Sequence, residues 1–467
     1  MGLDSVHASV STPEDVSPSS QHDRGFYVSS PASQMERSVE ESERDVFSQS
    51  ILNDLCNAWF ERYHPWFPIL HRLSVIGTIE DTVALEDSPI YIVLKAIIAV
   101  TLPHWSLSNP ISRETRSRIS EKFRKQIIIQ AISNLSLPSL QAVLIVTTID
   151  YGAGRLSEFW NLVALCKRMG IQLGLRDLVA NKFDNFNKLS TLPPRMIPVP
   201  TSLIEQEEKI RAYWMTEVLD SMSSLGAGWN LSLSLPESEL WFPCNEAVWA
   251  FPEKTTSFSS FDDSEVSSAF SVYLNLVTHQ LYQVHLFLQQ SYDATSAVDR
   301  ARWQSQCITI DEALDKWRNA NLEMNYLGHD STVVHGPWYH AIQRCLNACD
   351  EMSTVIRAIN DADLENMSPH MIFCIFVAAR FYLVHAKVLS VEIPRSLDLL
   401  IYGLKTCGQR WYFARRLEQV LHTAIAEKQV PVVMSALPQQ FYDLQYSSLD
   451  IDHALSIWAE DCRMPSI

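Results

Sequence analysis

The stretch "VFSQSILNDLCNAWFERYH", residues 46–64, decides the fold class that this sequence predicts. Large apolar side chains recur in it at every fourth position, at Phe47, Ile51, Leu55 and Trp59. This interval is close to the 3.6-residue turn of an α-helix, so the four side chains are expected to share one buried face. Pro65 and Pro68 follow directly and predict the end of that helix, because proline cannot continue the hydrogen-bond ladder.

The same helical period continues outward through the next two hundred or so residues. "SPIYIVLKAIIAV" and "SLPSLQAVLIVTTIDYGAG" both open with serine and proline at the start of an apolar run, which is a helix-start signal. "ISRETRSRISEKFRKQIIIQAIS" reads as a long amphipathic helix. "LSEFWNLVALCKRMGIQLGLRD" reads as another, closed by Gly174. A proline-rich loop is expected over residues 176–205, and a further helix over "EQEEKIRAYWMTEVLDSMSS".

Beyond residue 266 helical patterns are expected over 266–293, 299–320, 335–360, 369–391, 394–424 and 447–461. No period-two alternation is long enough to support a sheet, and glycine is scarce, with 13 residues. The sequence therefore predicts an all-α protein with one large multi-helix domain.

Two segments differ in composition from the helical body. Residues 1–48 are rich in Ser and Pro and carry nine acidic residues against three arginines. Such a segment buries too little apolar surface to offset its ordering entropy, so a disordered tail is expected. Residues 253–265 form a Ser-rich linker. The expected organisation is this tail, a helical half at 49–252, the linker, and a second helical half of the same body at 266–467.

Bulk composition excludes some functions and favours others. The chain has 467 residues, 47% of them apolar, and a formal net charge of -17, which disfavours general affinity for nucleic acid or anionic membranes. The nine cysteines show no repeated spacing and the N-terminal residues lack an apolar signal segment, so free thiols in a reducing compartment are expected. The apolar runs at 90–102 and 371–389 are interpreted as buried core helices rather than membrane spans.

Two groups of side chains raise the question of a metal site. His64 and His71 flank the aromatics and prolines of "RYHPWFPILHR", but they lie seven apart with no Cys-x-x-Cys or His-Glu-x-x-His motif beside them. Cys345 and Cys349 lie one helical turn apart, and no second pair completes a ligand set. We therefore expect architectural histidines and buried, apolar cysteines.

The main alternative to a protein that works by contact is a helical enzyme. "FDDSE", residues 261–265, is similar to the aspartate-rich magnesium motif of helical terpene synthases. It lies in the Ser-rich linker, however, and no nucleophile elbow, phosphate loop or dinucleotide fingerprint occurs. We expect no catalytic residue, no cofactor and no metal, and we keep a terpene-synthase-like enzyme with a divergent metal site as the alternative.

Several stretches together resemble one known family. "WFERYHPWFPILHR", "SLPSLQAVLIVTTIDYGAG" and "CKRMGIQLGLRD" are followed by the helix of Arg211 and by "FPCNEAVW", then by "MIFCIFVAARFYLVHAK" and "LKTCGQRWYFARRLEQVL". In this order, over residues 49–463, they resemble the fungal-specific transcription factor domain, the helical regulatory region of fungal zinc-cluster and zinc-finger activators. The resemblance implies structural family-motif positions at His64, Pro65, Phe67, Pro68, Arg211, Trp214 and Asp220.

The residues themselves constrain the roles of Arg211 and Asp220. They lie nine positions apart, about 2.5 helical turns, and so cannot pair with each other. A buried arginine needs carboxylates or carbonyls as partners, and Trp214, Val218 and Met222 are expected to face the core at four-residue spacing. The acidic residue that matches the family motif ahead of Arg211 is Glu208.

The chain departs from the relatives in one functional respect. Their DNA-binding zinc module precedes this domain, whereas here the first cysteine is Cys56, already inside the helical body. The resemblance then implies a nuclear transcriptional regulator or co-regulator of a metabolic or secondary-metabolite gene cluster that makes no direct DNA contact. Its expected partners are other transcription factors or co-regulators. A small-molecule effector and homo- or heterodimerisation are left open. The densest basic run, residues 116–125, is interpreted as a solvated helix face.

Overall fold

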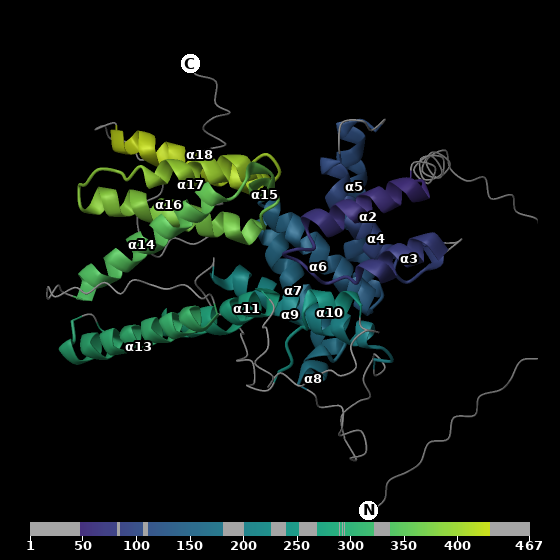
Figure 1. The fold of residues 1–467 in the computed structure, drawn as a ribbon, viewed down its shortest axis with the longest axis horizontal. Helices are drawn as coiled ribbons and strands as arrows, with labels where there is room; N and C mark the ends of the chain where they lie inside the picture. Colours follow the sequence, from purple (N-terminus) through teal and green to yellow (C-terminus); the bar gives the residue numbers. More distant parts are fainter. Residues whose placement is uncertain are drawn as a thin grey trace, which may run out of the picture. The chain divides into compact units, whose positions relative to one another are not determined.

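The structure is a computed structural model that describes residues 47–81, 85–105, 111–180, 200–225, 240–251, 269–288, 295–321 and 337–429, with isolated positions between 289 and 294. Every regular element in these described ranges is a helix (Figure 1), so the all-α prediction is confirmed. The expected tail at 1–48, the linker at 253–265 and the helix at 447–461 lie outside the described residues, apart from the last two positions of the tail.

The N-terminal half contains long helices with short 3₁₀ turns between some of them. They are α2 (Gln49–Arg62), α3 (Arg72–Asp81), η1 (Leu85–Asp87), α4 (Tyr91–Thr101), η2 (Leu102–His104), α5 (Arg113–Ser133), α6 (Leu137–Gly152), α7 (Leu156–Gln172), α8 (Leu175–Val179), α9 (Leu203–Leu225) and α10 (Glu246–Ala250).

The C-terminal half begins with α11 (Ala269–Asn275), which continues through a π-helical turn, η5 (Leu276–Gln280), into α12 (Leu281–Leu288). It goes on with α13 (Ala297–Asn321), α14 (Pro337–Ala358), α15 (Asp361–Glu365), α16 (Pro369–Val388), α17 (Ser396–Cys407) and α18 (Tyr412–Gln429).

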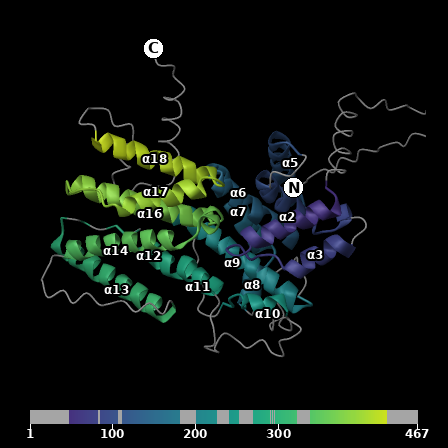
Figure 2. The same cartoon turned by 45° about the horizontal axis from the view of Figure 1, so that its top comes forward.

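Helix α6 is the centre of the N-terminal half. Fourteen of its sixteen residues are buried, because neighbours cover it on every side rather than along one stripe. It packs against α4, α5, α7 and α9, and α2 packs on α4. In the C-terminal half α16, α17 and α18 pack on one another and lie side by side in both views (Figures 1 and 2), while α14 covers α16 and α17.

Helix α16 is long and apolar enough to cross a membrane by length and composition alone. Yet 56% of its most apolar window is buried within the protein, and Arg380 lies on it at 8% exposure. It also contacts α6 of the other half. These features are those of a core helix, which is how the sequence was interpreted.

Local signals set the helix ends where the sequence predicts them. The Ser136 hydroxyl accepts a hydrogen bond from the backbone N–H of Ser139 and caps α6, with Pro138 in its first turn. Ser368 caps α16 in the same way. Gly174 follows α7 with φ of 68°, the left-handed conformation that glycine adopts without a steric penalty.

The prediction of one helix over 394–424 is wrong, because the chain breaks between Cys407 and Tyr412 into α17 and α18. The break lets the Trp411 ring pack directly on Gly152 of α6, where a Cβ atom would lie 2.0 Å from the ring. The tertiary contact between the two halves therefore overrides the helical pattern of the sequence.

Two smaller differences concern element bounds. The segment expected as a loop over 176–205 begins with the short helix α8 and ends inside α9, which starts at Leu203. The helix expected over 266–293 contains the π-helical turn and its last helical residue is Leu288. Local sequence patterns predict the type of an element better than its exact ends. The π-helical turn differs from the other errors, because it lies inside the predicted helix.

Candidate functional site

The first candidate site is a buried cluster around Arg211, which is 0% exposed on α9. Its Nε donates to Glu207 Oε1 at 2.7 Å, and its Nη1 lies 2.5 Å from Glu246 Oε1. The Pro68 carbonyl accepts from Nη1 at 3.1 Å and the Cys244 carbonyl from Nη2 at 2.8 Å. Each guanidinium nitrogen therefore has an acceptor, as a buried arginine requires.

Aromatic rings enclose this ion-pair cluster. The Arg211 guanidinium carbon lies 4.0 Å from the centroid of the Trp249 ring. His64 stacks on the same ring with centroids 6.0 Å apart, and His71 approaches it at 5.5 Å. Arg211 and Glu207 are buried beneath these rings, so their ion pair is held in a low-dielectric setting, whereas the Glu246 side chain is 45% exposed.

The two histidines have structural partners. The His64 Nε2 atom lies 3.1 Å from the Leu70 carbonyl, so it carries the proton and donates. The His71 Nδ1 atom lies 2.7 Å from the Ser74 hydroxyl. Burial, reinforced by the charge of Arg211, lowers the pKa of His64 to about 4, so its ring is neutral near pH 7. These contacts favour architectural roles for both rings.

Trp214 holds a second contact between the same segments. Its ring stacks on Phe242 with centroids 4.5 Å apart and planes 7° apart, and its Nε1 donates to the Trp241 carbonyl at 2.7 Å. Trp214, Val218 and Met222 are all buried, which confirms the predicted core face of α9.

The cluster joins three stretches that lie far apart in the sequence, and we call it the motif junction. Its members are residues 64–71, residues 207–214 on α9 and residues 241–249. The His71 backbone N–H donates to Glu208 Oε1 at 3.1 Å, which ties the first stretch to the second. Burial raises the pKa of Glu208 to about 7.

The structure brings most of the sequence-predicted positions to this junction, but not all. His64, Pro68, Arg211 and Trp214 contact its other members, while Phe67 is buried beside the Trp59 ring. Pro65 is exposed on the preceding turn.

Asp220 lies elsewhere on α9. Its carboxylate is 3.1 Å from the Lys167 ammonium, which also pairs with Glu217 at 2.7 Å. As the helical spacing implied, Asp220 and Arg211 have separate partners. This pairing ties α9 to α7 rather than to the motif junction.

Sequence reasoning missed part of the junction. The acidic partner of Arg211 is Glu207, one turn before it on α9, whereas the expected motif residue Glu208 binds a backbone N–H instead. The four-residue spacing of Glu207 and Arg211 was the available signal. Glu246 and Trp249 come from a segment more than thirty positions away, and no local pattern reveals that contact.

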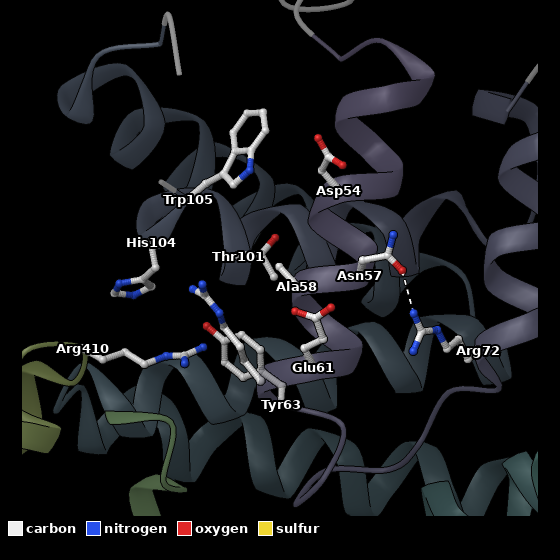
Figure 3. Close-up of a pocket in the computed structure, with 11 residues that line it drawn as sticks. Asp54, Asn57, Ala58, Glu61, Tyr63, Arg72, Thr101, His104, Trp105 and Arg410 are labelled. Atoms are coloured by element: carbon white, nitrogen blue, oxygen red, sulfur yellow. Dashed lines mark hydrogen bonds between the residues drawn. The ribbon is translucent and has the colours of Figure 1, made fainter. Parts of the chain in front are cut away.

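The second candidate site is a cavity of about 530 Å³ between α2, the η2 turn and the turn before α18 (Figure 3). We call it the arginine cavity, because three arginines are among the side chains that line it. The full lining is Asp54, Asn57, Ala58, Glu61, Arg62, Tyr63, Arg72, Thr101, His104, Trp105 and Arg410.

Arg410 is the most buried charged group of this cavity, at 6% exposure. Its guanidinium carbon lies 4.1 Å from the centroid of the Tyr63 ring, and its Nη1 donates to the Asn366 side-chain oxygen. Its Nε and Nη2 atoms are buried and have no hydrogen-bond partner among the residues that the structure describes. Figure 3 shows the Arg410 side chain directed toward Tyr63 with His104 beside it.

A nearby ion pair shows how this protein satisfies a similar guanidinium. Asp150 on α6 is fully buried, and its two oxygens accept from Arg124 Nε at 2.7 Å and Nη2 at 2.6 Å. Arg155 donates to Asp150 Oδ1 as well. Arg124 belongs to the basic run 116–125, so that run is not wholly the solvated face that the sequence suggested.

The other candidate groups lie apart from both sites. Cys349 is buried and its thiol donates to the Ala378 carbonyl at 3.5 Å, whereas Cys345 is exposed, so the expectation that both are buried is wrong for Cys345. Within the described ranges no group of three or more His, Cys, Asp or Glu side chains could hold a metal ion. The acidic stretch at 261–265 is outside those ranges.

Comparison with known proteins gives two matches. A family model described as the fungal specific transcription factor domain matches residues 57–319, which include the whole motif junction. A relative from Aspergillus versicolor, the notoamide biosynthesis cluster transcriptional coactivator, is 28% identical over 449 residues, covering 90% of this chain and 75% of its own length. No solved structure matches the chain.

Proposed function

Because this chain belongs to the fungal-specific transcription factor domain family, we propose that it is a transcriptional co-regulator of a biosynthetic gene cluster that acts through contacts with other proteins. The family and the coactivator relative mark a regulator of transcription rather than an enzyme. The observation that carries the proposal is the match to a cluster coactivator over 90% of the chain.

The chemistry of the motif junction supports a regulator without a reaction centre. Arg211, Glu207 and Trp249 are bound to one another and enclosed, so they hold the helices in place rather than facing a substrate. We infer that the seven family-motif positions are structural and that the chain has no catalytic activity.

The two helical halves support each other, which favours one regulatory body over 49–252 and 266–467. Trp66 in the first half donates from Nε1 to the Asn366 carbonyl, 300 positions later, at 3.0 Å. Helices α16 and α18 both contact α6. We infer that this body, acting in the nucleus, presents its surface to a DNA-bound transcription factor.

The net charge of -17 favours contact with a protein over direct contact with DNA, since a DNA-binding surface must neutralise phosphates. A gel-shift assay on promoter fragments of the cluster, with the purified chain at physiological salt, tests this. No shift is expected with the chain alone, and a supershift is expected once the partner zinc-cluster factor is present.

Transcript levels test the wider proposal. Deleting the gene in its native fungus is expected to change the transcripts of one contiguous set of biosynthetic genes, and re-introducing the wild-type gene restores them. Unchanged transcripts throughout such clusters would contradict cluster regulation. A shift of DNA by the chain alone would instead contradict only the co-regulator role.

A further inference from the structure

The arginine cavity combines three features of a ligand site. Its volume of about 530 Å³ falls in the range of small-molecule pockets, roughly 300–1,000 Å³. Aromatic rings from Tyr63 and Trp105 line it. It is also formed by both halves of the body, because Arg410 comes from the second half and the other lining residues from the first.

The lining of the cavity carries more positive than negative charge. Partial desolvation together with the charges of Arg410, Arg62, Arg113 and Arg116 lowers the pKa of His104, although the residue itself is exposed. The two acidic lining residues, Asp54 and Glu61, are exposed, so water screens their charges. Three arginines against two screened carboxylates leave an excess of positive charge in the lining, which favours an anion.

The hydrogen bonds of Arg410 indicate which chemical group a ligand of the cavity would carry. Nε and Nη2 form the side of a guanidinium that binds both oxygens of a carboxylate. Arg124 uses this side to hold Asp150, with both distances below 2.8 Å. In Arg410 the same two donors have no partner in the described part of the chain, although the residue is buried and leaving such donors unpaired is costly.

We propose that the arginine cavity binds a small organic anion, whose carboxylate or phosphate group pairs with the Nε and Nη2 atoms of Arg410. Both nitrogens are covered in the free protein, so the anionic group displaces part of the packing around the guanidinium as it binds. Arg62 supplies a second positive charge, and Tyr63 and Trp105 cover the rest of the ligand.

This inference deepens the proposed function, since it gives the regulator an effector site at the contact between its halves. Arg410 and Trp411 lie on the turn before α18, and Trp411 packs on Gly152 and near Tyr63. A ligand in the cavity would therefore affect the packing of Trp411 on Gly152, the contact that holds α6 against α18. Ligand binding is measured without any transcription readout, so its failure leaves the proposed function standing.

The test is equilibrium dialysis of the purified full chain against three probes: radiolabelled benzoate, radiolabelled inorganic phosphate and neutral benzamide. Saturable binding of benzoate or phosphate in the millimolar range is expected, with benzamide at least tenfold weaker. Binding of benzoate alone identifies a carboxylate ligand, and binding of phosphate alone identifies a phosphate ligand. Equal binding of benzamide, or no binding of either anion, would overturn the proposal.

Variants locate the site. Arg410→Lys keeps the charge but loses the two-donor side, and it is expected to weaken anion binding about tenfold or more. Arg302→Gln, a 66% exposed arginine on α13, is the matched control and should bind as wild type. If circular dichroism shows Arg410→Lys unfolded, Arg62→Gln replaces it with the same expectation. If the folded variant that is tested, Arg410→Lys or its replacement Arg62→Gln, binds the anion with unchanged affinity, the assignment of the anion site to the arginine cavity is overturned.

Discussion

The motif junction and the arginine cavity each contain a buried arginine, and they differ in how its nitrogens are satisfied. Arg211 has acceptors for all three nitrogens, from Glu207, Glu246 and two backbone carbonyls. Within the described ranges Arg410 has one acceptor, for its Nη1 atom, and its Nε and Nη2 have none. A buried arginine whose donors are all hydrogen-bonded is accommodated in the fold, whereas one with unpaired donors beside a cavity retains the capacity to bind a ligand.

The largest expected effect is that of Arg211→Met. This variant leaves the buried Glu207 carboxylate without its cation, so the free energy of unfolding should fall by about 3–5 kcal/mol. Guanidinium denaturation followed by circular dichroism measures it. The double variant Glu207→Gln/Arg211→Met should recover part of the loss. A loss below about 1 kcal/mol would mean that the junction does not depend on this ion pair.

The second effect is a pH dependence at the junction. Burial raises the pKa of Glu208 from 4.5 to about 7, so the native state holds an extra proton between these values. Stability from this group is therefore highest below pH 4.5 and falls by up to roughly 3 kcal/mol as the pH rises to 7. Glu208→Gln cannot titrate and should lack that fall.

Unfolding free energies of wild type and Glu208→Gln between pH 4 and 8 measure this effect. The difference between the two curves cancels the titration of His64 and of other groups. Glu392→Gln, an exposed change of the same charge, is the control and should run parallel to wild type. Parallel curves for Glu208→Gln as well would show that Glu208 does not hold a proton in the junction.

The third effect tests the contact that brings the arginine cavity's two sides together. In Gly152→Ala the new Cβ atom would lie 2.0 Å from the Trp411 ring, so overpacking should cost about 2 kcal/mol. Gly170→Ala on α7 is the matched control, because nothing lies within 4 Å of its Cβ position. That control should keep or gain stability in thermal denaturation. Equal effects of both changes would contradict the packing of Trp411 on Gly152.

The smallest effect is that of Arg410→Met. The variant loses one hydrogen bond to Asn366 and the contact with Tyr63, but it also removes two unsatisfied buried donors. The net loss of stability should be about 1 kcal/mol, well below that of Arg211→Met. Losses of equal size in the two variants would remove the distinction drawn between the sites.

Much of the fold was predictable because helix period and capping are local. Leu55 and Trp59 are buried on α2, Ser136 caps α6 and Gly174 closes α7, all as the sequence indicates. The break between α17 and α18 was not predicted, because the apolar pattern over 394–424 was interpreted as one helix, although Gly408 stands at the C-cap of α17. At the break the Trp411 ring packs on Gly152, which lies more than 250 residues earlier in the chain.

The candidate sites also contain some residues that the sequence indicated and others that it did not. The resemblance placed Arg211, Trp214 and His64 among the important positions, and the structure shows them in contact with one cluster. It also named Asp220, which lies with Lys167 instead. Arg410 was part of a quoted helix but carried no signal of its own, because an unsatisfied donor is defined by what surrounds it in space.

The sequence by itself determined the helical class, most helix positions and the apolar faces, since these follow from residues within one or two turns of each other. The tertiary structure alone decided which acceptors meet Arg211 and which donors of Arg410 remain unpaired. The reason is separation along the chain: the Pro68 carbonyl that binds Arg211 is 143 positions away, and Asn366, which binds Arg410, is 44. A contact over such distances depends on how whole helices pack, and no local pattern encodes it.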